Sequence, residues 1–207
     1  MKAIKAALFS VMVLAFLSFY QTETEAHSPD LHSGMSGGAV TELQKKLKQL
    51  GYFDVVPTGY FGSITKDAVI DYQRDFGISA TGYYGTLTQS SMAETEMMAK
   101  VVHGEARGES YIGKVAVAAV ILNRKQSAQF PNSIRGVVFQ RNAFTAINDR
   151  QYYLTPNSSA YQAVKDAVKG WDPSRGASYY YNPSGVSDQW IFSRTVITKI
   201  GKHVFAK

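Results

Sequence analysis

The chain has 207 residues, of which 45% are hydrophobic and 18% charged, so it is long enough for one domain and a small second one. It carries 22 Lys and Arg against 16 Asp and Glu, a formal net charge of +6. It has no cysteine, which excludes disulfides, cysteine-ligated zinc and thiol nucleophiles.

The first 26 residues have the pattern of a secretory signal peptide. Lys2 and Lys5 give the positive start, residues 6–20 are apolar apart from two serines, and small residues precede the expected cleavage point after Ala26. An uncleaved membrane anchor is the alternative, although the apolar run is shorter than the about 20 residues that a span needs. Both interpretations place the rest of the chain outside the cytoplasm.

The basic excess lies in the second half of the chain. Residues 27–92 carry 5 Lys and Arg against 6 Asp and Glu, a net −1, whereas residues 93–207 carry 15 against 8, a net +7. A basic surface attracts polyanions. An exported protein is a poor candidate for binding nucleic acid, whereas a cell wall with peptide carboxylates fits the compartment. A basic surface without a partner is the alternative.

A Ser- and Gly-rich spacer, residues 27–37, precedes a first helical unit, residues 38–92. The apolar spacing within residues 40–50 predicts a helix that ends at Gly51. A second helix is expected from about Ser63 to Phe76.

An internal repeat marks this first unit. TGYFGSIT, residues 58–65, returns 23 residues later as TGYYGTLT, residues 81–88, and in each copy a glycine turn leads into a Ser or Thr placed as a helix N-cap. With the preceding LxxxLxxLGY, the pattern resembles the three-helix peptidoglycan-binding domain of bacterial wall hydrolases. That resemblance implies binding of glycan or stem peptide without chemistry. A helical spacer whose aromatic residues all lie in its core is the alternative.

Residues 93–207 predict a second unit that is mainly α with a minor β element, and no obvious linker precedes it. Residues 97–107 can be helical, and the three alanines in the apolar run 115–122 favour a buried helix over a strand. An amphipathic helix is expected with Pro156 at its first position and Gly170 after its end. The aromatic and β-branched tail predicts a small β-hairpin.

The main chemical signal is HGEARGES, residues 103–110. If this segment is helical, Glu105 and Glu109 share a face, with Cβ atoms about 5–6 Å apart. A neighbouring negative charge and partial burial both raise a carboxyl pKa. A glutamate protonated near neutral pH supplies the proton that cleavage of a glycosidic bond needs. A solvated helix face with Arg107 as counter-ion is the alternative.

Metal and serine chemistry have weaker signals. His103 and His203 lie a hundred residues apart without a further evident ligand, so the zinc signal is weak and no metal or cofactor is expected. The second half has no GxSxG motif and no convincing Ser/His/Asp set.

Aromatic and amide side chains could provide the rest of a sugar site. Tyr179, Tyr180, Tyr181 and Asn182 follow one another, with Trp190 and Phe192 nearby, and Phe144 and Thr145 are a further candidate pair. Residues in a strand alternate sides, so only some of these can face one cleft. The alternative is that most of the aromatic residues belong to the core.

The motif VVHGEARGESYIGKVAVAAVILNR, with NAFTAI, YYYNP and WIFSR…KIGKHVF, covers nearly all of residues 95–207 and resembles the cell wall hydrolase family of SleB-type spore cortex-lytic enzymes. The order of signal, binding domain and catalytic domain is also similar, although the spacer between domains is shorter than in a typical member. The resemblance implies a goose-type lysozyme-like α+β catalytic domain. It also implies a secreted lytic transglycosylase that leaves a 1,6-anhydro end on spore cortex or vegetative wall.

By its place in this motif, Glu105 matches the family's catalytic acid. A transglycosylase needs one glutamate, because the muramic 6-hydroxyl attacks internally, whereas a hydrolase needs a second carboxylate. The resemblance and the aromatic pattern together give the expected substrate-binding residues Glu109, Phe144, Thr145, Tyr180, Tyr181 and Asn182. An N-acetylmuramoyl-L-alanine amidase and a non-catalytic wall-binding protein remain the alternatives. A regulatory protein partner is left open.

Overall fold

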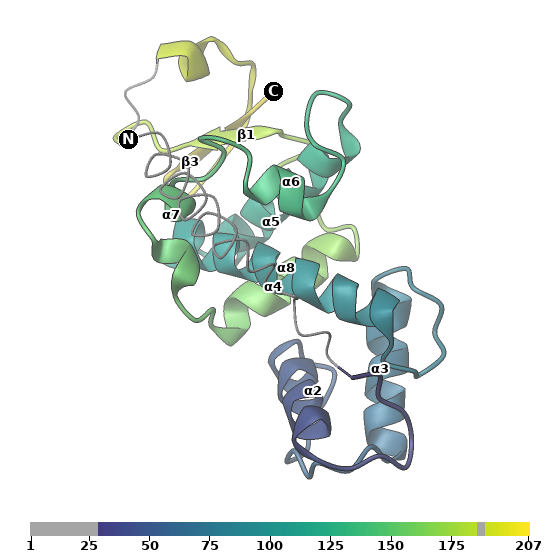
Figure 1. Ribbon diagram of the computed structural model, residues 1–207. Coiled ribbons are helices and arrows are strands. Elements are labelled where there is room, and N and C mark those ends of the chain that lie inside the picture. The colour runs from purple at the N-terminus through teal and green to yellow at the C-terminus, as the bar shows by residue number, and fades with distance from the viewer. Residues whose placement is uncertain (1–28, 186–188) are drawn as a thin grey trace, which may run out of the picture.

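The computed structural model describes residues 29–185 and 189–207, so the expected signal peptide lies outside the described part of the chain. Figure 1 shows two helical units, a smaller N-terminal one and a larger one that carries a small sheet. The mainly α class with a minor β element is therefore confirmed. Within the described ranges, no helix combines the length and the apolar character needed to cross a membrane.

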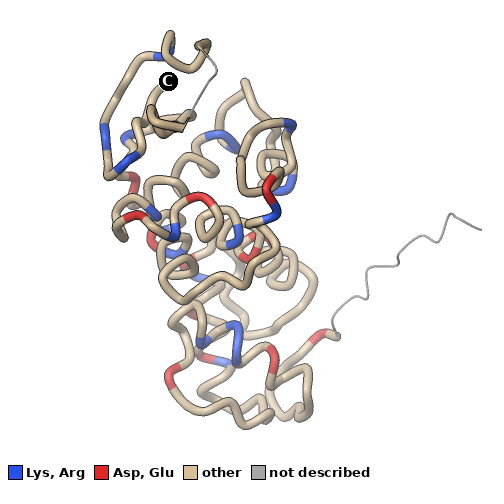
Figure 2. The backbone as a smooth tube through the Cα atoms, turned by 90° about the vertical axis from the view of Figure 1, so that its left-hand side faces the viewer, with Lys and Arg blue, Asp and Glu red and all other residues tan. Residues whose placement is uncertain are grey.

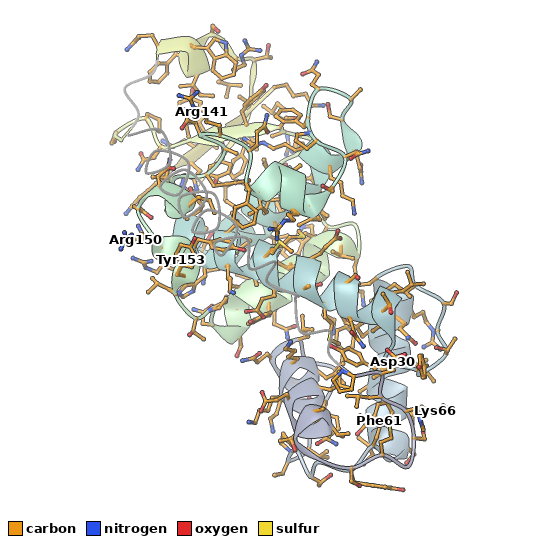
Figure 3. All side chains as sticks on the ribbon, viewed as in Figure 1. Asp30, Phe61, Lys66, Arg141, Arg150 and Tyr153 are labelled. Atoms are coloured by element: carbon orange, nitrogen blue, oxygen red, sulfur yellow. The ribbon has the colours of Figure 1, made fainter. Side chains whose placement is uncertain are left out.

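The smaller domain consists of α2 (Gly38–Gln49), α3 (Ser63–Asp75) and the first turns of α4 (Thr86–Ala106). Apolar residues at helical spacing bury one face of each helix, and the fully buried Phe61 lies in this domain (Figure 3). The chain leaves α2 through Gly51, whose φ of +74° is readily adopted only by glycine. The expected end of this helix is thus confirmed.

A buried glutamine ties the first copy of the repeat to its helix. The Gln44 amide donates to the Tyr60 carbonyl and the Thr65 hydroxyl, both at 2.9 Å, and its oxygen accepts from the Gly59 N–H at 2.9 Å. The buried Gly59 N–H has no other acceptor among the described residues and so depends on the glutamine for its partner, whereas the Tyr60 carbonyl also accepts from the Gly62 N–H at 3.0 Å.

The second copy of the repeat uses the same arrangement. The Gln73 amide donates to the Tyr83 carbonyl at 2.8 Å and to the Thr88 hydroxyl at 2.9 Å, and its oxygen accepts from the Gly82 N–H at 2.9 Å. The sequence repeat is therefore also a repeat of one hydrogen-bond network.

The helices that follow these turns do not begin as expected. Gly62 and Gly85 occupy the N-cap positions without a side-chain cap, and Ser63 and Thr86 are the first helical residues. The expected Ser and Thr caps are wrong by one position. The glutamine network already fixes each turn, so the helix starts do not require a capping hydroxyl.

One helix, α4, joins the two domains. Its 21 residues begin as the third helix of the smaller domain and end at Ala106 in the centre of the larger one (Figure 1). The domain boundary expected between residues 92 and 93 therefore falls inside an unbroken helix.

A second contact holds the smaller domain against α8 (Ser158–Val168). Asp75 accepts a hydrogen bond from the Tyr52 hydroxyl at 2.8 Å and lies 3.2 Å from Lys169 Nζ. Lys165 Nζ lies 3.9 Å from the centre of the Tyr52 ring. Partial burial acts to raise the pKa of Asp75, but the hydrogen bonds from Tyr52 and Lys169 outweigh it and lower that pKa. This charged contact and α4 together connect the domains at two places.

The core of the larger domain is α5 (Tyr111–Gln126), packed against α4 and α8. Residues 115–121 are at most 2% exposed, which confirms the predicted buried helix. The predicted start of α8 is wrong, because its N-cap is Asn157, whose side chain accepts from the Ala160 N–H. The helix therefore begins two residues later than predicted, where the Asn157 side chain satisfies a free helix N–H and Pro156 lies before the cap.

Short helices and a small sheet complete this domain. The helices are α6 (Ile134–Val138), α7 (Thr145–Asn148) and the 3-10 turn η1 (Gln151–Tyr153). The antiparallel strands are β1 (Tyr179–Tyr181), β2 (Val196–Ile200) and β3 (His203–Ala206), in the order β1-β3-β2. The expected hairpin is β2–β3, and β1 adds an edge strand to the buried β3.

Replacing Gln44 by Met should keep the packing volume and leave the buried Gly59 N–H without an acceptor. The Tyr60 carbonyl and the Thr65 hydroxyl each lose one hydrogen bond. We expect the free energy of unfolding to fall by about 1–3 kcal/mol, because a buried donor left without a partner is costly. Urea denaturation followed by circular dichroism measures this. Gln49→Met is the matched control on the exposed side of α2 and should change stability by no more than about 0.5 kcal/mol. Equal stabilities of the two variants would contradict the role given to the network.

Candidate active site

Glu105 lies in the last turn of α4, with its carboxylate turned towards α7. Its Oε1 accepts a hydrogen bond from the Ala146 N–H at 2.5 Å. The buried side chains of Val101, Val102 and Ala106 hold this turn of the helix against the core. The carboxyl group is thus positioned by a rigid helix and by one backbone donor from a different part of the chain.

The contact between α4 and α7 depends on Gly104. A Cβ at this position would lie 2.5 Å from the Ala146 Cβ and 3.4 Å from the Gln151 Cβ. Real side chains do not approach so closely, so only glycine allows α7 and η1 to pack directly on the helix. The glycine before the glutamate therefore determines where the Ala146 N–H can reach.

Burial raises the pKa of the Glu105 carboxyl above its ordinary value of about 4.5, and the negative charge of Asp149 adds to this. The Ala146 N–H, the Tyr180 hydroxyl and the charge of Arg124 act in the opposite direction without cancelling the effect. The negative charge that raises the pKa of Glu105 is thus that of Asp149, directly after α7, and not that of Glu109 as the sequence suggested. The structure favours a carboxyl that keeps its proton to higher pH than an exposed glutamate.

Arg124 is a buried cation beside this carboxyl. It is 6% exposed, and its guanidinium donates to the Ser178 carbonyl at 2.7 Å and to the Ala143 carbonyl at 3.3 Å. Its charge also lies 4.9 Å from the centre of the Phe144 ring. Carbonyls and aromatic faces therefore stabilise this charge, and it remains available to stabilise a negative charge on Glu105.

The Tyr180 hydroxyl is fully buried next to Glu105. It lies close enough to lower the pKa of that carboxyl. Its distance and angle to every neighbouring group fall outside those of a regular hydrogen bond. Burial raises the pKa of Tyr180 well above 10, so the hydroxyl keeps its proton. The ring of His203 packs against Tyr180 with centroids 5.1 Å apart. Catalytic contacts are often long before a substrate binds, so this hydroxyl is placed to donate to a Glu105 carboxylate.

A cavity of about 640 Å³ opens in front of Glu105. Its walls come from α4, α5, α7, β1, β3, the loops on either side of α6, the segment after β1, and the 3-10 segment η2 (Gln189–Ser193). Both polar and aromatic side chains line it, and Arg141, labelled in Figure 3, is among them. Aromatic faces mixed with amide and hydroxyl groups are suited to a carbohydrate ligand.

The expected site residues mostly come together. Thr145, Tyr180, Tyr181 and Asn182 line the same cavity as Glu105. Tyr179 lines it too, although strict alternation along β1 would turn neighbouring tyrosines to opposite sides. This is an edge strand of only three residues, so the cavity extends around it.

Two of the expected substrate-binding residues lie elsewhere. Phe144 is 2% exposed and packs behind the cavity between Arg124 and Tyr180. Glu109 does not share a helix face with Glu105, because α4 ends at Ala106. The Glu109 carboxylate accepts a hydrogen bond from the Lys202 N–H at 3.2 Å and so contacts the β2–β3 turn instead of the cavity.

Sequence reasoning missed Arg124, Asp149 and the Ala146 N–H. Arg124 could have been found, because it continues the buried spacing of Val117, Val120 and Ile121 along α5. The other two act on Glu105 across more than 40 residues of sequence, and no local pattern indicates them. Among residues 29–185 and 189–207, no three His, Asp or Glu side chains form a group that could hold a metal ion.

Comparisons with known proteins match both units. Residues 108–206 match the Cell Wall Hydrolase family and residues 36–92 match the peptidoglycan binding domain family. A spore cortex-lytic enzyme of Bacillus cereus is 38% identical, with 97% of this chain and 98% of that protein aligned. The chain belongs to the spore cortex-lytic enzyme family. A spore cortex-lytic enzyme of Oceanobacillus iheyensis is 33% identical, with 98% of each protein aligned.

Solved structures match the larger domain of this family member. The catalytic domain of Bacillus cereus SleB is 56% identical, has a TM-score of 0.53, and covers 55% of this chain and 89% of that chain. By its family, the protein is a cell-wall-degrading enzyme with a peptidoglycan-binding domain. The Cell Wall Hydrolase match begins at Gly108, so the position of Glu105 in the site rests on geometry.

The alignment with the Bacillus cereus relative also shows a difference in length. It extends over 255 positions, whereas this family member has only 207 residues, so the relative has at least 48 positions without a counterpart here. Here the two matched domains are separated only by residues 93–107, which are the last two thirds of α4 and the residue after it.

Replacing Gly104 by Ala should force α7 away from α4 and move the Ala146 N–H from Glu105. We expect a loss of about 1–3 kcal/mol in the free energy of unfolding, as for other overpacked sites. Wall-degrading activity should fall by about 100-fold, because small displacements of catalytic groups are costly. Thermal unfolding and turbidity loss of purified walls measure the two effects. Gly108→Ala is the matched control, because nothing lies within 4 Å of its added methyl group. Normal activity of the Gly104 variant would show that the close contact is dispensable.

The raised pKa of Glu105 predicts how stability depends on pH. The folded state binds this proton more tightly than the unfolded state, so its contribution to stability is complete at low pH and is lost as pH rises through the folded pKa. Glu105→Gln removes this loss and still offers an oxygen to the Ala146 N–H. The variant should therefore gain stability relative to the wild type between about pH 4 and pH 8, measured by urea unfolding at each pH. A difference that stays constant across this range would argue against a raised pKa.

Proposed function

We propose that this spore cortex-lytic enzyme family member is a lytic transglycosylase. It cleaves the bond between N-acetylmuramic acid and N-acetylglucosamine in peptidoglycan, with Glu105 as its one catalytic glutamate. One observation carries the proposal: among the described residues that line the cavity, Glu105 alone has a carboxyl group. A two-carboxylate hydrolase needs a second carboxyl group on the same cavity.

The reaction uses Glu105 first as an acid and then as a base. Its protonated carboxyl donates the proton to the glycosidic oxygen, and the bond from that oxygen to C1 of the muramic residue breaks. The Glu105 carboxylate then accepts the proton of the C6 hydroxyl of the same muramic residue, and O6 forms the new bond to C1. The product is a 1,6-anhydro end, and no water is consumed.

The surrounding groups support both states of Glu105. Burial favours the protonated acid before the reaction. After the proton leaves, the Ala146 N–H, the Tyr180 hydroxyl and the Arg124 charge are placed to stabilise the carboxylate. A single carboxyl group can therefore perform both steps without a large penalty for either protonation state.

The other expected residues divide by position. Thr145, Tyr181 and Asn182 line the cavity and are assigned to contacts with the sugar. Phe144 supports Arg124 and Tyr180 from behind. Glu109 is assigned to holding the β2–β3 turn, which keeps His203 beside Tyr180.

The relatives named spore cortex-lytic enzymes support the spore cortex as the place of action, with the vegetative wall as the other candidate. The smaller domain, which matches the peptidoglycan binding domain family, is assigned to holding the wall. Figure 2 shows most of the Lys and Arg positions on the larger domain, which suits an acidic wall polymer.

Digestion of purified cortex and vegetative peptidoglycan, followed by mass spectrometry of the released fragments, tests the proposal. The wild type should release anhydro-muropeptides, and Glu105→Gln should reduce their rate at least about 1,000-fold, because it removes the only proton donor of the reaction. Glu109→Gln is the matched control and should retain the activity, since Gln can still accept from the Lys202 N–H. Asp188→Asn is compared in parallel, because Asp188 stands in the sequence between the lining residues Gly185 and Trp190.

Each other product identifies a different function. Fragments with free reducing ends would mean a hydrolase, and loss of activity in Asp188→Asn would then identify the second carboxylate. Released stem peptides would mean an N-acetylmuramoyl-L-alanine amidase. A wild type that binds the wall and releases nothing would be a binding protein.

A further inference from the structure

A second cavity, of about 470 Å³, lies beside the first. The two cavities share Gln129 and Tyr179 in their linings, so a ligand that fills the first can extend a substituent into the second across these side chains. Neither the proposed acid nor the sugar contacts assigned above belong to the second cavity.

The second cavity has a basic lining. Arg194 and Lys207 contribute two positively charged side chains, and the other lining residues are amides, hydroxyls and a glycine, without an acidic side chain. The main-chain oxygen of Lys207, the last residue of the sequence, accepts a hydrogen bond from the Thr195 N–H at 2.9 Å. The Asp172 side chain contacts the lining residues Asn123 and Gly176 but does not itself line the cavity. Its carboxylate already accepts hydrogen bonds from Asn123, Ser174 and the Gly176 N–H.

Arg194 is held in place without an acidic partner among the described residues. Its guanidinium carbon lies 4.1 Å from the Trp190 ring centre and 5.6 Å from the Tyr179 ring centre. Its Nε is buried and donates to no acceptor. Buried donors of this kind are rare unless a ligand or water satisfies them. Lys207 Nζ approaches the same wall, 3.1 Å from the position of a Cβ at Gly176.

We infer that this second cavity is a carboxylate-binding subsite, which takes the acidic end of the substituent on a muramic residue bound in the first cavity. The inference rests on the proposed function, because it names a further part of the same substrate. An arginine with free donors and a second cation are the groups that recognise a carboxylate in proteins. Muramic residues carry such a group in two forms: the free carboxylates of a stem peptide and, where no peptide is attached, the carboxylate of the lactyl ether.

Binding measurements on the catalytically inactive Glu105→Gln protein test the inference separately from cleavage. The probes are an N-acetylmuramyl peptide with free carboxylates, the same peptide with its carboxylates converted to amides, and N-acetylmuramic acid. Isothermal titration calorimetry or NMR titration gives each Kd. We expect the carboxylate form to bind about 10-fold more tightly than the amide form, as for other charge-assisted hydrogen bonds.

Arg194→Gln in the same background should remove this preference, so that both peptide forms bind with nearly equal Kd. Lys207→Gln should reduce the preference in part, and it covers the case in which loss of Arg194 disturbs the fold. Lys199→Gln is the matched control, because it removes an exposed positive charge that lines neither cavity. It should leave the preference unchanged.

The source of the carboxylate follows from the third probe. If N-acetylmuramic acid also loses affinity in Arg194→Gln, the lactyl carboxylate is the ligand. If only the peptide form does, the stem peptide is the ligand. The subsite would be overturned if the Glu105→Gln protein bound the carboxylate and amide peptides equally, or bound neither, and if Arg194→Gln also left the affinity for N-acetylmuramic acid unchanged. Failure of the proposed cleavage would show instead in the digestion products.

Discussion

The burial of the last turn of α4 is the constraint on which the site depends. Gly104 lets α7 pack directly on this turn, and the Ala146 N–H thereby reaches the Glu105 carboxyl. The same packing removes water from the carboxyl and raises its pKa. Position and proton affinity therefore have one common cause, so the acid cannot be moved without also changing its chemistry.

Much of the fold follows from local patterns. The buried α5 was predictable because an eight-residue apolar run rich in alanine fits a core helix, and Gly51 marked the end of α2 correctly. The helix starts were less predictable. Glycines stand at the start of α3 and α4, where buried glutamines fix the preceding turns, and Asn157 caps α8 through its own side chain.

The site was predictable only in part, for a physical reason. Glu105 stood out by its motif and by the resemblance. The prediction that Glu109 is its neighbour on the same helix face was wrong, since α4 ends at Ala106. Asp149 and Ala146 affect Glu105 through contacts between distant segments, which leave no periodic signal in either one. Arg124 did leave such a signal, as a cation on an otherwise apolar helix face.

The unbroken α4, with the contact between Asp75 and Lys169, also defines a length. A flexible linker lets a binding module anchor an enzyme while the catalytic site samples many bonds around it. Here the smaller domain and Glu105 are both part of the one helix α4, so the distance between the bound wall and the cleaved bond is constant. Under the proposed function, the protein has the geometry of a molecular ruler, in which the spacing of cuts along a strand is set by the rise of a single helix.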